Sequence, residues 1–270
     1  MNRRVLVLVA SFFACIVFMV YAENVGWLKE TKHKEEAELV RSSEIEIPVE
    51  IKNFKASPDG DDSALLSGLF SEVTDYTPPN KELQVYMGGQ TEVVDNRFII
   101  TAKHVDDQYF SGKLESQIAF RYGTFSFRVN TMNGKGLFPA IWLMPSEGNL
   151  FPELDIYELI GSEPEIFYGV LHYYKNDMQK RNFFQHKFSS KKIPDSYEIK
   201  LDWTPEELTW YLNGKKIHSV TDHVPQVPMF MNINLAIGGI WPGKPDSSTP
   251  FPAKFNVDIL EFNVEEAYSR

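Results

Sequence analysis

Along most of the chain, hydrophobic and polar residues alternate in short runs that prolines and other turn-forming residues separate. Residues 197–203 alternate with a period of two, which predicts a half-buried β-strand. The runs 208–211 and 216–220 flank Asn213-Gly214, a dipeptide typical of a type I′ hairpin turn. After residue 60 no helical period of comparable length appears. The pattern predicts an all-β fold of two packed antiparallel sheets, a β-sandwich.

One of the predicted strands carries three carboxylates within six residues, in the segment Glu153-Leu-Asp-Ile-Tyr-Glu158. In an extended strand Glu153 and Asp155 share a face, whereas Glu158 points to the other one. A β-bulge with one extra residue, at Ile156 or Tyr157, would bring all three carboxylates to one face and leave one of those two residues toward the core. Bulges are frequent beside active sites, so this segment is a candidate catalytic site.

Carboxyl groups this close cannot all remain ionised, so at least one should titrate at a raised pKa while another stays a carboxylate. Retaining glycosidases need such a pair about 5 Å apart, one as the nucleophile and one as the acid/base. Neighbouring positions on one face of a strand provide about that separation. The alternative is a solvated acidic edge strand, which the apolar residues Leu154, Ile156 and Leu159 disfavour.

With Gly161, this segment resembles the Glu-Ile-Asp-Ile-Met-Glu-x-x-Gly signature of glycoside hydrolase family 16, in its laminarinase-like branch. Just upstream, Gly136-Leu-Phe-Pro-Ala-Ile-Trp-Leu-Met-Pro145 resembles the family's stretch before the site. Further blocks follow in the family's order, namely Asn80–Gln84, Phe98–Ala102, Phe110–Leu114, Tyr168–His172, Trp203–Tyr211, Asn234–Gly239 and Phe255–Asp258. The resemblance covers roughly residues 78 to 264.

The chain departs from the family pattern at several positions. Phe138 replaces the usual Trp, Ser126 stands where many members carry Glu, and Pro152 replaces the Gly before the first catalytic Glu. These changes concern substrate preference more than catalysis. Residues 46–77 match poorly and lack the usual opening strand, which leaves any metal that depends on this strand without support.

The resemblance implies a β-jelly roll of the concanavalin A-like type, with one curved sheet forming an open cleft. It implies that Glu153 is the nucleophile, that Glu158 is the acid/base, and that Asp155 hydrogen-bonds and tunes the nucleophile. Catalysis of this kind needs no cofactor. Asp258 matches a position that holds a structural calcium in some members, although one carboxylate does not make a site that needs six or more oxygens.

Sugar rings present apolar faces and polar edges, so a polysaccharide cleft needs flat aromatic side chains with amides and carboxylates around them. We expect Trp142 and Trp241 to be such platforms, because they lie beside or in loops, whereas Trp203 and Trp210 lie in well-patterned strands and should pack in the core. The polar candidates for substrate binding are His172, Asn234 and Gln84, for each of which a structural hydrogen bond is the alternative.

The N-terminus divides the chain into further parts. Arg3 and Arg4 precede an apolar run from Val5 to Tyr21, so residues 1–22 are predicted to be a signal peptide or an uncleaved signal anchor. Residues 23–46 are rich in Lys and Glu and predict a charged spacer, and residues 47–270 are the predicted catalytic domain. We therefore expect an extracellular protein, secreted or anchored at the outer face of the cell membrane.

Charge and length restrict the partners. The formal net charge of -10 disfavours nucleic acid and is compatible with neutral polysaccharide. The 270 residues fit one β-sandwich domain, and we expect a monomer. The sequence predicts a retaining endo-glycosidase that hydrolyses β-1,3-glucan of the laminarin type or mixed-linkage β-glucan. The alternatives are a transglycosylase or galactanase of the same fold, or a non-catalytic glucan-binding module.

Overall fold

The structure is a computed structural model that describes residues 68–269, except 79, 149 and 190–192. The predicted signal segment (1–22), the predicted spacer (23–46) and the first part of the predicted catalytic domain lie outside the described residues. Within the described residues, no helix has the length and apolar character needed to cross a membrane.

Nearly all of the regular structure is β-strand, as the alternating pattern predicted. The strands in chain order are β1 (Phe70–Glu72), β2 (Gln84–Tyr86), β3 (Thr91–Val94), β4 (Arg97–Val105), β5 (Gln108–Ser111), β6 (Lys113–Asn130), β7 (Leu137–Pro145), β8 (Glu153–Leu159), β9 (Ile166–Lys175), β10 (Met178–Lys187), β11 (Ser196–Trp203), β12 (Leu208–Leu212), β13 (Lys215–Val220), β14 (Met229–Ile237) and β15 (Ala253–Ser269).

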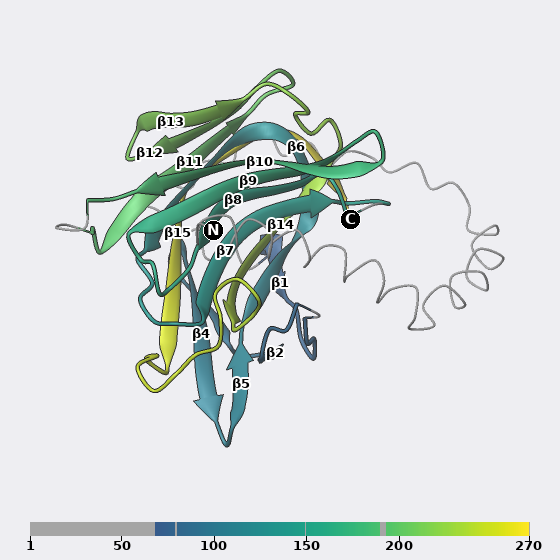
Figure 1. Ribbon diagram of the computed structural model, residues 1–270. Helices are drawn as coiled ribbons and strands as arrows, with labels where there is room; N and C mark the ends of the chain where they lie inside the picture. Colours follow the sequence, from purple (N-terminus) through teal and green to yellow (C-terminus); the bar gives the residue numbers. More distant parts are fainter. Residues whose placement is uncertain (1–67, 79, 149, 190–192, 270) are drawn as a thin grey trace, which may run out of the picture. The chain divides into compact units, whose positions relative to one another are not determined.

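The strands β10, β9, β8, β7 and β14 lie side by side in a curved layer (Figure 1). The long strand β6 connects this layer to the second one, because its residues 113–120 pair with β14 and its residues 123–130 pair with β11. Between these two parts, Tyr122 (φ 62°) and Gly123 (φ 143°) adopt positive φ values. A side chain on Gly123 would come within 2.3 Å of the carbonyl oxygen of Asn263, so this position requires glycine.

The core between the layers includes both tryptophans that the sequence assigned to it. Trp203 and Trp210 are almost fully buried. The indole N–H of Trp203 donates a hydrogen bond to the carbonyl oxygen of Pro225 (3.1 Å), and that of Trp210 donates to the carbonyl oxygen of Ile156 (3.2 Å). Because both indole donors are satisfied inside the protein, burial of these large side chains is favourable.

The local predictions for β11 to β13 are confirmed. Every second residue of β11 is buried, and β12 and β13 form a hairpin across Asn213 (φ 48°) and Gly214 (φ 75°). Positive φ values at both turn residues are those of a type I′ turn.

One strand pair departs from the predicted antiparallel arrangement, since β2 runs parallel to β5. The chain passes from β2 through β3 and β4, which pair antiparallel, and then enters β5. Two reversals between β3 and β5 allow the chain to return beside β2 in the same direction.

Candidate active site

Strand β8 carries a β-bulge at the predicted place. Its register against β9 shifts between Asp155 and Glu158. Ile156 and Tyr157 are both fully buried in the core, whereas the sequence predicted that only one of them would point there. With two consecutive side chains in the core, the alternation resumes in the opposite phase, and Glu153, Asp155 and Glu158 share the other face.

His172 lies directly opposite Glu153 on the neighbouring strand β9. Its Nε2 atom is 3.4 Å from Oδ2 of Asp155, which is close enough for an ion pair. On the other side of the ring, Nδ1 of His172 is buried without a hydrogen-bond partner among the described residues. Asp155 is only 3% exposed. The structure therefore brings His172 to two of the predicted carboxylates, because one ligand atom each of Glu153, Asp155 and His172 lies within 4.8 Å of the others.

The pKa values of both glutamates are raised. Burial, reinforced by the charge of Asp155 and opposed by His172, raises the pKa of Glu153 to about 8. Burial raises the pKa of Glu158 well above its usual range, and the charges of Asp155 and Glu153 act in the same direction. Burial lowers the pKa of His172, but the contact with Asp155 and the charges of Asp155 and Glu153 outweigh it and raise this pKa overall. A cluster that retains protons beside a carboxylate suits paired acid and nucleophile roles.

The structural calcium predicted at Asp258 stays a prediction, because most of residues 46–77, on which such a site would depend, lie outside the described residues. In the described part of the chain, the group whose ligand atoms converge well enough for a metal ion is Glu153, Asp155 and His172, which lies in the cluster above. Asp258 itself forms an ion pair with Arg97, whose Nε and Nη2 atoms donate to its two oxygens, the second at 3.1 Å.

Trp142 and Asn234, both predicted to bind substrate, contact each other. The half-buried Trp142 donates its indole N–H to the side-chain oxygen of Asn234 (2.7 Å), and the amide nitrogen of Asn234 donates to the Tyr86 hydroxyl (3.0 Å). The ammonium of Lys113 lies 5.3 Å from the Trp142 ring. Asn234 is buried, so its amide fixes the orientation of Trp142, which lies opposite Asp155 on β7.

Gln84 is not placed to contact a sugar, and that prediction is corrected. Its side chain is fully buried. The amide oxygen accepts a hydrogen bond from the backbone N–H of Ile237 (2.8 Å), and the amide nitrogen donates to Glu82 (2.6 Å). Gln84 therefore ties β2 to the end of β14 and has no exposed polar atom.

Trp241 is 47% exposed in the loop that follows β14, as expected for a platform. Its ring lies 4.7 Å from Tyr168 and 5.6 Å from Phe138. Tyr168 stands opposite Glu158 on β9, so these rings border the predicted acid/base. The sequence analysis missed Tyr168 as a site residue, because only the register between β8 and β9 places it there.

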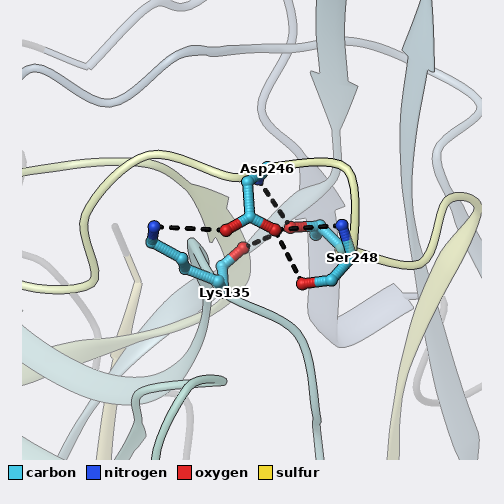
Figure 2. Close-up of polar contacts among 4 residues, drawn as sticks. Lys135, Asp246 and Ser248 are labelled. Carbon is cyan, nitrogen blue, oxygen red and sulfur yellow. Dashed lines mark hydrogen bonds and ion pairs between the residues drawn. The ribbon is translucent and has the colours of Figure 1, made fainter.

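Hydrogen bonds tie the Trp241 loop to the turn before β7 (Figure 2). The ammonium of Lys135 lies 3.2 Å from the Asp246 carboxylate, which also accepts hydrogen bonds from the Ser248 backbone N–H (2.9 Å) and hydroxyl (2.6 Å). The hydroxyl of Thr249 donates to the carbonyl oxygen of Lys135 (2.7 Å). These contacts fix the loop on which Trp241 stands.

Replacing Gly136 in this turn by Ala is expected to lower the free energy of unfolding by roughly 2–4 kcal/mol. Gly136 has φ 81°, and a side chain there would lie 2.4 Å from the backbone nitrogen of Pro245, in the Trp241 loop. Gly148→Ala is the matched control, because Gly148 has φ 82° with no atom within 4 Å of the added carbon. Denaturant unfolding should show a clearly smaller loss for the control; equal losses would mean that the approach of Pro245 is unimportant.

Comparisons with known proteins identify the family of this chain. The family model of glycosyl hydrolases family 16 matches residues 79–258. The chain is 29% identical over 206 residues to the endo-1,3-1,4-beta-glycanase EglC of Rhizobium meliloti, covering 67% of this chain and 43% of that protein. It is 28% identical over 213 residues to a beta-glucanase of Rhodothermus marinus, and the match covers 67% of this chain and 73% of that protein. The chain thus spans less than half the length of EglC.

A solved structure shows the same architecture. The endo-beta-1,3-glucanase of Pyrococcus furiosus superimposes with a TM-score of 0.62 at 27% sequence identity, over 75% of this chain and 89% of that one. This agreement confirms the predicted jelly-roll sandwich. Since the matched region contains the β8 cluster and both layers of the sandwich, the chain belongs to glycosyl hydrolases family 16.

Proposed function

We propose that this chain is a retaining endo-β-glucanase that hydrolyses β-1,3-glucan or mixed-linkage β-glucan by double displacement. The observation that carries the proposal is the β8 bulge, which gathers Glu153, Asp155 and Glu158 on one face. The raised pKa values of the two glutamates and the activities of the relatives named above support it.

In the first step, the carboxylate of Glu153 attacks the anomeric carbon and forms a glycosyl-enzyme ester. The bond from that carbon to the leaving oxygen breaks, and Glu158 donates its proton to this oxygen. In the second step, Glu158 takes a proton from water, and the resulting hydroxide oxygen displaces Glu153 from the sugar. Both residues return to their starting states, and the cycle needs no cofactor.

Asp155 and His172 act in opposite directions on the nucleophile. Asp155 is almost completely buried, and its charge adds to the effect of burial, which raises the pKa of Glu153. His172 opposes this effect because its positive charge lowers the pKa of Glu153. The balance between these two neighbours adjusts how readily Glu153 becomes a carboxylate.

The test is reducing-end release by the purified full-length protein on laminarin, mixed-linkage glucan and agarose, with Glu153→Gln alongside. We expect release from a β-glucan and none from the variant. Release from agarose alone would make the protein a galactanase. Accumulation of longer oligosaccharides at high acceptor concentration would make it a transglycosylase. Absence of release from all three substrates would overturn the proposal.

Replacing His172 by Gln is expected to move the acid limb of the kcat/KM profile to higher pH. The limb reports the ionisation of the free enzyme's nucleophile. Because the His172 charge lowers the pKa of Glu153, its removal raises that pKa further, and a higher pH is needed to form the carboxylate. The profile is measured for both proteins between about pH 4 and pH 9, a range of about five units that includes neutrality. A limb that moves to lower pH would contradict this role of His172.

A further inference from the structure

The edge strand β10 presents side chains on the same face as the catalytic cluster. Arg181 lies opposite His172 on β9, and Phe183 lies opposite Val170. Val170 in turn lies opposite Asp155 on β8. Residues directly opposite in neighbouring strands share a face of the sheet, so Arg181 and Phe183 extend the face of the carboxylates by two strands.

Phe183 is 42% exposed, although its neighbour Phe184 on the other face packs against Trp210 at 5.3 Å. The Phe183 ring lies 5.5 Å from the Tyr168 ring and nearly parallel to it, at 26°. Tyr168 is 4.7 Å from Trp241. A row of three rings therefore leads from the Trp241 loop, past Glu158, to the edge of the sheet. Exposed apolar surface that continues a binding site is characteristic of ligand contact.

Arg181 supplies the polar part of this surface. It is exposed, its guanidinium lies 5.7 Å from the Phe183 ring, and it forms no ion pair with a carboxylate of the described residues. Its charge opposes the burial that raises the pKa of Glu158, so the guanidinium lies within electrostatic range of the catalytic group. A planar guanidinium beside an aromatic ring can donate several hydrogen bonds in one plane, which suits the hydroxyls around a sugar ring.

The distance between β8 and β10 indicates which sugar unit of the substrate this surface would contact. Neighbouring strands lie about 4.8 Å apart, so β10 is roughly 10 Å from β8, which is about two hexose lengths. We infer that Phe183 and Arg181 form a sugar-binding subsite two sugar units away from the scissile bond. This subsite binds a neutral β-linked glucosyl unit. The apolar face of that sugar contacts Phe183 and its hydroxyls accept hydrogen bonds from Arg181. The inference rests on the proposed glucanase activity for the identity of the sugar.

The first test is calorimetric titration of a β-1,3-linked glucohexaose into full-length Glu153→Gln, with and without Phe183→Ala. The aromatic contact should make binding about tenfold weaker in the double variant. Met178→Ala is the matched control, since Met178 is also exposed on β10 (54%) but lies on the opposite face, in the phase of Phe184. Equal effects of the two substitutions, or no effect of Phe183→Ala, would overturn the subsite.

The second test uses Phe183→Ala and Arg181→Gln in the otherwise unchanged protein. We expect KM to rise for the hexaose and much less for the trisaccharide, because a short substrate can bind without this subsite, and we expect kcat to be little changed by Phe183→Ala. An equal loss for both substrates would show a structural role and overturn the inference. If the unchanged protein releases no sugar but hexaose binding still depends on Phe183, the glucanase activity fails and the subsite stands.

Discussion

Glu153→Gln and Glu158→Gln are each expected to lower kcat by at least about 10³-fold while leaving glucan binding largely intact. Glutamine keeps the shape of the side chain but can neither form the glycosyl ester nor transfer a proton. Both glutamates lie on the same face of β8 as Asp155, which is buried and unable to replace either of them. Steady-state hydrolysis of laminarin, together with calorimetric glucan binding, measures the two effects separately.

An activated substrate separates the two roles. An aryl glucoside with a good leaving group needs little protonation, so Glu158→Gln should still form the glycosyl-enzyme and release one equivalent of the phenol in a burst. Glu153→Gln should give no burst, because it lacks the nucleophile. Glu147→Gln, an acidic residue in the loop before β8, is the control. Near-normal turnover by either catalytic variant would exclude the assignment.

The second large effect concerns stability, since Glu153→Gln is expected to stabilise the fold increasingly as the pH rises from 5 to 8, by roughly 1–3 kcal/mol at the upper end. Glu153 has a pKa of about 8 in the folded protein against the usual 4.5. Between these values the folded protein holds a proton that the unfolded chain has lost. Its free energy of unfolding therefore falls as the pH rises, by up to about 1.4 kcal/mol per pH unit for one group. Glutamine does not titrate, so the variant does not lose this part of the free energy of unfolding as the pH rises.

Denaturant unfolding at about pH 5, 6, 7 and 8 measures how the free energy of unfolding differs between the variant and the original protein. Steps of about one pH unit resolve the expected slope. Glu92→Gln, at an exposed position on β3, serves as the control and should show no comparable pH dependence. A difference that stays constant or shrinks with rising pH would contradict the buried, protonated state of Glu153. The expected result would show that the site is maintained at a cost in stability.

Much of the site could be predicted because its signals are local. Alternation within β11 and the Asn213-Gly214 turn depend on neighbouring residues alone, and both are confirmed. The bulge was predicted from the spacing of Glu153, Asp155 and Glu158, since one strand cannot place them on one face without it. The sequence left open which of Ile156 and Tyr157 faces the core. Both side chains face the core, and there the backbone carbonyl oxygen of Ile156 accepts a hydrogen bond from the Trp210 indole.

The predictions that failed, and the residues that were missed, depend on contacts between distant segments. Gln84 is a polar residue like any sugar ligand, but the position of β14 buries it completely. In the same way, the ion pair of Asp258 with Arg97 depends on the pairing of β15 with β4, while the calcium predicted at Asp258 stays a prediction.

The sequence by itself determined the strands, the face of β8 that carries the three carboxylates and the enzyme family, because these follow from the period of the side chains and from the types of residue. Only the tertiary structure decided which residues surround that face. The register of β8, β9 and β10 brings Tyr168 and Phe183 into line with Glu158 and Asp155, and the contact between Lys135 and Asp246 fixes the Trp241 loop. Such pairings join residues far apart in the chain, and they are selected by the packing of the whole sandwich, which no local pattern encodes.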